Sequence, residues 1–358
     1  MKHQLKHTGR KGFTLIEVSL SMVILTIIML VAVQVLDQTQ RTWKRGVGNI
    51  EQFREARMAF NSITQNLREA LLNTYLAYQY NESDTPTVPT SKSQAPERYI
   101  RQSELQFVTG QARDLLQSGQ TDALSSPGHA VFFQARLGLS DRDGYENLRR
   151  LLCGRGYFLL HSDDEAFRPA HVNATRSRFR LWEYRPTAES NTIYSPQEGT
   201  RWFGDALTGV ISGSDSIERP SFTRPIAENI VALIISPQVT SEDAEAEESV
   251  PWWIAPDYAY DSATAANTGI NSPQGTQHML PPRVVVTLVA IDESSAAKLA
   301  EKYPDSAPQL IPDGSFSRCS EMRADLQALE QKLVAEQLNY RVFSATINMR
   351  NSKWGLLR

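Results

Sequence analysis

The chain has 358 residues, of which 41% are hydrophobic and 22% charged, and its formal net charge is −3. This composition excludes a disordered tail and leaves enough chain to bury a core in one large or two small domains. The slightly acidic balance argues against nucleic acid as the main partner.

The amino-terminal region combines a short basic segment with a long apolar run. The run extends from Phe13 to Leu36 and follows Lys2, Lys6, Arg10 and Lys11, whose removal would bring the formal net charge from −3 to −7. The run is about 24 residues, or roughly 36 Å as a helix, which is long enough to cross the hydrocarbon of a bilayer. It is therefore a candidate membrane anchor.

The charges on either side of this run bear on its orientation. The basic residues before it favour a cytoplasmic amino terminus and an extracytoplasmic remainder. Arg41, Lys44 and Arg45 weaken this argument, whereas Trp43 suits an interfacial belt on the far side. We expect a single-pass inner-membrane protein whose carboxyl-terminal domain lies in the periplasm.

One acid, Glu17, interrupts the apolar run at its fifth position. A carboxylate at membrane depth is costly unless another group compensates for its desolvation. A lone acid here would be protonated or would snorkel to the cytoplasmic face.

The stretch KGFTLIEV, from Lys11 to Val18, lies between the basic segment and the apolar run. It resembles the prepilin processing and N-methylation signal of type IV pilins and type II secretion pseudopilins. The resemblance implies that a membrane peptidase cleaves between Gly12 and Phe13 and methylates the Phe13 amine. It also implies that Glu17 contacts the amino terminus of a neighbouring subunit, whose ammonium within about 4 Å would offset desolvation of both charges. Many major pilins have a proline about 22 residues into the mature chain; here that position is Gln34, which predicts a helix that kinks less easily.

Beyond Leu36, apolar residues recur at steps of three and four, which predicts an amphipathic continuation of the helix over residues 37–80. In pilin-like proteins this part of the helix packs on an antiparallel sheet, and a free coiled coil is the alternative. Asn81, Asp84 and two prolines that follow are expected to end the helix. The stripe consists of Val47, Ile50, Phe53, Ala56, Phe60, Ile63, Leu67 and Leu71.

Residues 81–358 are predicted to form a β-rich globular domain, so that the whole is an α+β, pilin-like fold after a leader at 1–12 and an anchor at 13–36. A helical insertion is expected at 294–338, and residues 240–282, with the acidic run SEDAEAEES, are interpreted as a long surface loop. Segments rich in β-branched and aromatic residues predict strands at 105–109, 130–136, 156–161, 178–184, 226–236, 283–291 and 341–349.

Two further resemblances lie in the globular domain. The segments RVVVTLVAID and YRVFSATINMRN resemble the carboxyl-terminal region of J-type minor pseudopilins. The segments RGYFLLHSDD, SRFRLWEYRPTAES and PPRVVVTLVAID are similar to segments of Verru_Chthon cassette protein C. Together with the amino-terminal signal, they imply a non-enzymatic minor pilin or pseudopilin, with other pilin subunits and the prepilin peptidase as partners. The size of the chain, far above that of a minimal major pilin, favours a low-copy subunit near the tip of a pseudopilus or pilus. The alternative is a stand-alone anchored binding protein or enzyme that uses the prepilin export route.

The sequence lacks the usual signatures of catalysis and cofactor binding. It contains no Walker loop, dinucleotide glycine pattern, HExxH, CxxC or GxSxG. We therefore predict no catalytic residue and no cofactor. His129, His161, His171 and His278 would remain after leader removal, and they lack close metal-ligand spacing.

Two smaller patterns leave alternatives open. Asp141, Asp143 and Glu146 resemble part of a calcium loop without its first ligand, so an Asp-Gly turn is favoured over a weak calcium site. Cys153 and Cys319 would lie in an oxidising compartment, where they form either a disulfide or two separate buried thiols.

Overall fold

The computed structural model describes residues 15–81, 88–116, 126–145, 147–165, 168, 171, 175–194, 201–208, 210, 222–240, 252–264, 274–304, 306–312 and 314–354, and only the backbone of 40–52. The chain forms two units, Met1–Gln52 and Phe53–Arg358. The helices are α1 (Leu15–Gln52), α2 (Arg54–Arg68), α3 (Ala112–Leu115), α5 (Glu293–Lys302) and α6 (Met322–Ala335), with short 3₁₀ turns η2 (Thr192–Tyr194) and η3 (Cys319–Glu321).

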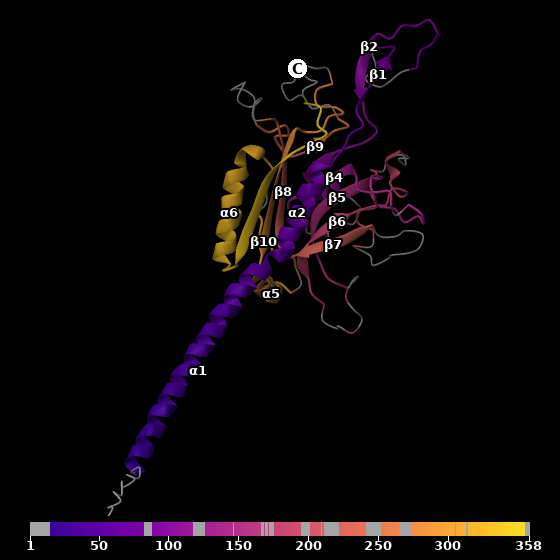
Figure 1. Cartoon of the computed structure of the whole chain (residues 1–358). Helices are drawn as coiled ribbons and strands as arrows, with labels where there is room; N and C mark the ends of the chain where they lie inside the picture. The colour runs from indigo at the N-terminus through magenta and orange to yellow at the C-terminus, as the bar shows by residue number, and fades with distance from the viewer. Residues whose placement is uncertain are drawn as a thin grey trace, which may run out of the picture. The chain divides into compact units, whose positions relative to one another are not determined.

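The strands of the second unit form two antiparallel sheets and a separate two-stranded ribbon of β1 and β2 (Figure 1). Among the described residues the large sheet has the order β7-β6-β5-β4-β3-β9, and the small sheet has the order β11-β10-β8. The strands are β1 (Tyr75–Gln79), β2 (Arg98–Gln102), β3 (Val108–Gln111), β4 (His129–Arg136), β5 (Leu152–Ser162), β6 (Arg178–Tyr184), β7 (Thr223–Glu228), β8 (Ile230–Gln238), β9 (Tyr260–Asp261), β10 (Arg283–Ile291) and β11 (Tyr340–Asn348).

Helix α2 packs against both sheets, with contacts to β7 of the large sheet and β11 of the small one (Figure 1). Ile63 and Leu67 on its apolar face are completely buried, in one cluster with Leu159 of β5 and Leu233 of β8. Burying side chains of this size stabilises a fold by about 1.5–3 kcal/mol each. The predicted stripe therefore packs on sheets rather than forming a free coiled coil. The α+β class is confirmed, and the arrangement is consistent with a pilin-like fold.

A buried polar chain fixes α2 on the large sheet. Asn66 of α2 donates from Nδ2 to the hydroxyl of Tyr157 at 2.6 Å, and that hydroxyl donates to Glu183 at 2.8 Å. Arg155 pairs with the same carboxylate at 3.3 Å. Because an unsatisfied buried polar group is costly, sliding α2 along the sheet would be penalised, and the network sets its position.

The amphipathic helix ends earlier than predicted. A turn at Phe53 separates α1 from α2, and α2 ends at Arg68 rather than near residue 80. Beyond it, the Leu71 N–H donates to the Gln134 carbonyl at 2.9 Å, and the following YLAYQ segment pairs as β1 with β2. Aromatic residues favour strands, so sheet pairing replaces the last helical turns.

The strands at 178–184 and 283–291 have the predicted limits, but the single strand predicted at 226–236 is wrong. The chain turns at Asn229, whose φ is 62°, and passes from β7 in the large sheet to β8 in the small one. Asparagine tolerates this left-handed conformation at little cost, so the turn needs neither glycine nor proline.

The segments predicted as a surface loop and a helical insertion both contribute to the core. Within the described part of 240–282, Ile254, Tyr258 and Tyr260 are buried, so the interpretation of this whole segment as surface loop is wrong. In the insertion, α5 and α6 cover the outer face of the small sheet through Leu299, Leu329 and Leu333, among others. These residues pack on apolar side chains that alternate with those facing α2.

His129 joins the two sheets. Its Nδ1 accepts from the Ile235 N–H of β8 at 3.0 Å, its Nε2 lies 3.0 Å from the Phe316 carbonyl, and its ring lies 4.4 Å from that of Tyr258. These partners assign the proton to Nε2 of a neutral ring. At Gly128, just before it, a Cβ would lie 2.5 Å from the Leu233 carbonyl oxygen, so this close approach requires glycine. Burial lowers the pKa of His129 to about 4.

The buried histidine predicts acid sensitivity. Because its pKa falls from 6.5 in the unfolded chain to about 4 in the folded one, the unfolded state binds more protons between these values, and stability decreases as pH falls through them. This pKa difference corresponds to a loss of about 3 kcal/mol in the free energy of unfolding. In urea unfolding of the whole protein in detergent, wild type should lose about that much more than His129→Gln between pH 7 and pH 4. Equal losses in the two proteins would contradict the assignment.

Candidate functional site

Glu17 lies in the first turn of α1. The hydroxyls of the helix bond to its own backbone: Ser19 to Ile16 at 3.0 Å, with equivalent bonds from three other side chains. Glu17 is the one ionisable residue between Leu15 and Leu36, and within the described part of the chain its carboxylate has no partner. A negative charge is favourable at a helix amino terminus. The Glu17 carboxylate is also available to a cation of another molecule.

The rest of α1 offers an apolar surface. The segment Leu15–Thr39 has a mean hydropathy of 2.6 over its most apolar window, and none of that window is buried. The helix passes Gln34 without a break, as the absence of proline predicts. A helix that is apolar on all sides requires lipid or partner helices around it, so α1 fits a single-pass membrane anchor. Gly12 and Phe13, the predicted processing residues, lie outside the described residues.

The two cysteines are free thiols buried in different places, and the disulfide alternative is not formed. The Sγ of Cys153 in β5 lies 3.3 Å from the Leu139 carbonyl oxygen, and that of Cys319 in η3 lies 3.1 Å from the Ala255 carbonyl oxygen. Burial raises the pKa of Cys153 and raises that of Cys319 to about 11. Both thiols are therefore protonated and unreactive near neutral pH. Sequence could not reveal this because pairing depends on a Cα separation that only the fold sets.

The remaining candidate residues are dispersed. Within the described residues, no group of three or more His, Cys, Asp or Glu side chains is placed to hold a metal ion. Asp141 and Asp143 are exposed, and the chain turns at Gly144, with φ of 87°, in the favoured Asp-Gly turn. Glu146, the third residue of the calcium hypothesis, lies outside the described residues. His171 is exposed, and His278 is buried beside the ribbon strand β2.

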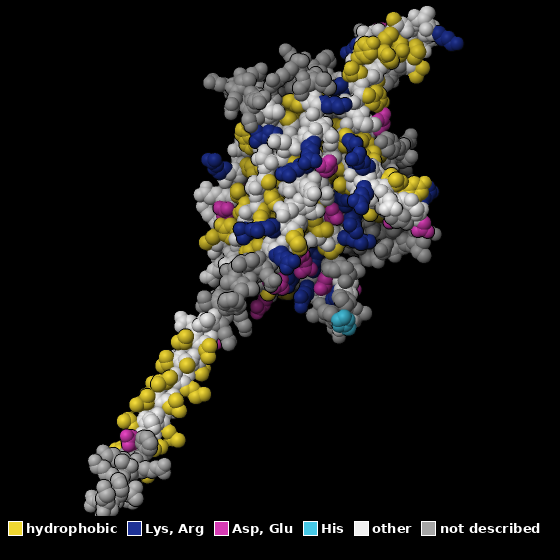
Figure 2. Space-filling model, in the orientation of Figure 1, with side chains coloured by type: hydrophobic (Ala, Val, Ile, Leu, Met, Phe, Trp, Pro, Cys, Tyr) yellow, Lys and Arg dark blue, Asp and Glu magenta, His cyan; other side chains and the backbone are white. Residues whose placement is uncertain are grey.

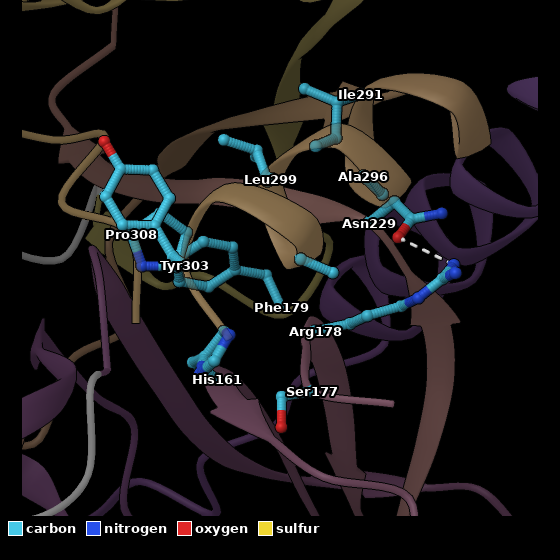
Figure 3. A pocket seen from close by; sticks show the side chains of 11 residues that line it. His161, Ser177, Arg178, Phe179, Asn229, Ile291, Ala296, Leu299, Tyr303 and Pro308 are labelled. Carbon is cyan, nitrogen blue, oxygen red and sulfur yellow. Dashed lines mark hydrogen bonds between the residues drawn. The ribbon is translucent and has the colours of Figure 1, made fainter. Parts of the chain in front are cut away.

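His161 lines a small cavity beside α5, together with Arg178 and Asn229 (Figure 3). The cavity volume is about 20 Å³, which corresponds to about one water molecule. Arg178 donates to the Asn229 side chain at 3.4 Å and binds the carboxylate of Glu293 through both terminal nitrogens. Burial and the nearby charge of Arg180 lower the pKa of His161. The terminal nitrogens of Arg178 are bound to Glu293, so the arrangement fits a structural clamp between β6 and α5.

One surface feature had no counterpart in the sequence-based predictions. The exposed face of α2 carries Arg54, Arg57 and Arg68 at helical spacing, and Lys and Arg side chains gather over this part of the second unit (Figure 2). Helix α2 also contains Glu55, and Glu69 follows it, so the spacing of its charges alone did not distinguish a basic face from a mixed one. Only the placement of each side chain separates them.

Comparison with known families identifies a processing signal at the amino terminus. Residues 8–33 match the prokaryotic N-terminal methylation motif. The chain therefore carries a prepilin-type signal. The match spans Gly12, Phe13 and Glu17 and supports a pilin-like protein that is processed by a prepilin peptidase and assembles with pilin subunits. No curated protein and no solved structure matches the chain significantly.

The signal predicts the mature terminus. The protein isolated from cells with an active prepilin peptidase should begin at Phe13 and carry a methylated amine, because Gly12 precedes Phe13 in the matched motif. Mass spectrometry of the terminal peptide measures this directly. A terminus at Met1, or one beyond Leu36, would contradict it, and Gly12→Val provides an uncleaved control.

The thiol geometry predicts redox insensitivity. Because Cys153 and Cys319 are free and buried in different parts of the second unit, denaturation without reductant should release two titratable thiols per chain, and the folded protein should titrate none quickly. Reductant should leave the melting temperature unchanged. If thiols are detected only after reductant is added, the two cysteines form a disulfide and the assignment of free thiols is wrong.

Proposed function

We propose that this chain is a minor pilin or pseudopilin-like structural subunit of a type II secretion or type IV pilus-like assembly. In this role α1 lies in the inner membrane or in the fibre, and the second unit lies in the periplasm. The observation that carries the proposal is the methylation motif at residues 8–33, which includes the start of α1, where Glu17 is the one ionisable residue between Leu15 and Leu36. The size of the second unit, far above that of a minimal major pilin, favours a low-copy subunit near the tip.

The proposed chemistry of Glu17 follows from its surroundings. Cleavage after Gly12 would create a positively charged amine on Phe13, four residues before the carboxylate. An ammonium and a carboxylate at low dielectric attract strongly, and each reduces the desolvation cost of the other. We assign the partner of Glu17 to the Phe13 amine of a neighbouring subunit, since helices packed side by side in one membrane bring these groups to similar depths.

A structural rather than catalytic role fits the second unit. Its buried arginines are paired with acids within the fold, Arg155 with Glu183 and Arg178 with Glu293. Its most strongly perturbed histidine, His129, is fully enclosed and bonded on both nitrogens. These groups stabilise the scaffold, which leaves the helices and the exposed surfaces for assembly.

Loss of the Glu17 charge should weaken assembly without affecting the fold. Glu17→Ala should leave membrane insertion and melting of the second unit nearly unchanged, because no described residue depends on this carboxylate. Breaking the proposed pair should lower association with partner subunits about a hundredfold. Cysteines placed along the anchor helices can measure this by cross-linking in native membranes.

Ser21→Ala is the matched control for this experiment, since it removes a polar atom from the same helix that bonds only to the Val18 carbonyl. It should cross-link as wild type does. Should Glu17→Ala also cross-link as wild type does, Glu17 is not the assembly contact. Isolation of the membrane complex then tests the role itself, because a pilin-like subunit should co-purify with other prepilin-type proteins, whereas a stand-alone anchored protein should not.

A further inference from the structure

The exposed face of α2 is a cationic stripe, made of Arg54, Arg57 and Arg68. None of these side chains has an ion pair or hydrogen bond within the described part of the chain. The two acids next to the stripe have partners elsewhere in the second unit. Glu55 accepts from the Glu228 N–H at 3.0 Å, and Glu69, which follows α2, pairs with Arg350 at 2.6 Å.

Arginines on the two neighbouring strands widen this stripe. Arg224 is exposed on β7 and Arg341 is exposed on β11, the strands that α2 contacts. The guanidinium of Arg341 lies over the Phe343 ring, 5.5 Å from its centroid, which leaves its N–H donors available. Five exposed arginines thus lie on α2 and on the two strands that it contacts, in a chain whose net charge is negative. A charge excess of this kind calls for an acidic partner.

The chain itself carries a matching acidic run. Residues 242–248 contain five carboxylates and no basic residue. The described residues on either side close its base: the Val239 N–H donates to the Trp252 carbonyl at 3.1 Å. Trp252 lies beside Cys319 and Met322 at the start of α6. Glu55 accepts a bond from Glu228, which precedes β8, so the arginines at the start of α2 lie at the opposite end of β8 from this base.

The acidic run is too short to lie along the stripe of its own copy. The base lies at the end of β8, where β8 pairs with the start of β10 and β10 pairs with the end of β11. The eleven residues 241–251, closed at the base, reach at most about 18 Å from it. Arg54 lies at the other end of β8, next to Glu55 and its partner Glu228, and the nine residues of β8 alone span about 30 Å.

We infer that the cationic stripe of α2 binds the acidic run 242–248 of a second copy of this chain. The lengths agree, because seven extended residues span about 20 Å and the stripe spans about 21 Å. Two different surfaces meet in this contact, so it can join, one to the next, the few copies expected of a low-copy subunit. The inference rests on the proposed role as an assembling subunit, and it names one of the partners.

Mixed cross-linking of full-length protein in detergent tests this contact. One population carries Asn61→Cys, which replaces an uncharged residue on the stripe, and the other carries Ala246→Cys in the acidic run. The two native thiols are buried. Oxidation of the mixture should give a disulfide-linked dimer. Arg54→Glu with Arg57→Glu in the first population, or Glu245→Lys with Glu247→Lys in the second, should each lower the yield about tenfold. Combining the two reversals should restore the yield to within about threefold of the starting pair.

The control is Arg149→Glu with Arg150→Glu, which makes the same charge change on exposed arginines of the loop between β4 and β5. It should leave the yield unchanged, and 1 M salt should lower the yield of the starting pair, because exposed charges are then screened. Yields that ignore the reversals, a failure of the combined variants to recover, or an equal loss in the control would each overturn the inference. The inference would also be overturned if no cross-link forms between copies and the charge reversal instead abolishes binding to phosphatidylglycerol vesicles.

This outcome is distinguishable from failure of the proposed function. Processing at Phe13 and co-purification of prepilin-type proteins test the role, whereas the charge reversals test only this contact. Arg54, Arg57, Glu245 and Glu247 lie outside the motif at residues 8–33, so the reversed variants should still be processed. A protein that is processed and co-purifies with partners, but whose cross-linking does not respond to charge, retains the role and loses the contact.

Discussion

The packing of α2 between the two sheets is the interaction on which the second unit depends. Ile63 and Leu67 are fully buried against strands of both sheets, and truncating a side chain of this kind costs about 2–5 kcal/mol. Neither sheet could bury its inner face without this helix. Because α2 is joined to α1 through Phe53, the residues that complete the core also attach the globular unit to its anchor.

This arrangement separates the parts that provide stability from the parts available for assembly. Inside the second unit, polar groups such as Asn66, Tyr157 and Glu183 satisfy one another and give α2 a unique position on the large sheet. In α1, by contrast, the described side chains are exposed and mostly apolar, and Glu17 has no described partner. A change in the core therefore alters the fold, whereas a change at the first turn of α1 alters what the anchor can associate with.

Sequence reasoning succeeded where one local signal determined the outcome. The strands β6 and β10 have the predicted limits because their apolar, β-branched or aromatic residues end at turn-forming neighbours. The signal around Glu17 was recognisable because it depends on the order of residues rather than on their packing. Sequence-based prediction failed where distant segments compete. The segment YLAYQ pairs as a strand and ends the helix early, and Asn229 divides one apolar run between two sheets. The partners of Cys153 and Cys319 depended on distances that no spacing encodes.

The cationic stripe of α2 shows why a surface is harder to predict than a core. In sequence, Glu55 follows Arg54 and Glu69 follows Arg68, so two of the three arginines stand next to an acid. In the fold, Glu69 pairs with Arg350, and Glu55 directs its carboxylate to the backbone N–H of Glu228 in β7. Glu69 is thereby matched by a fourth arginine instead of neutralising Arg68. Tertiary contacts therefore increase the positive excess that α2 already has in sequence, and that excess is the property an acidic partner would recognise.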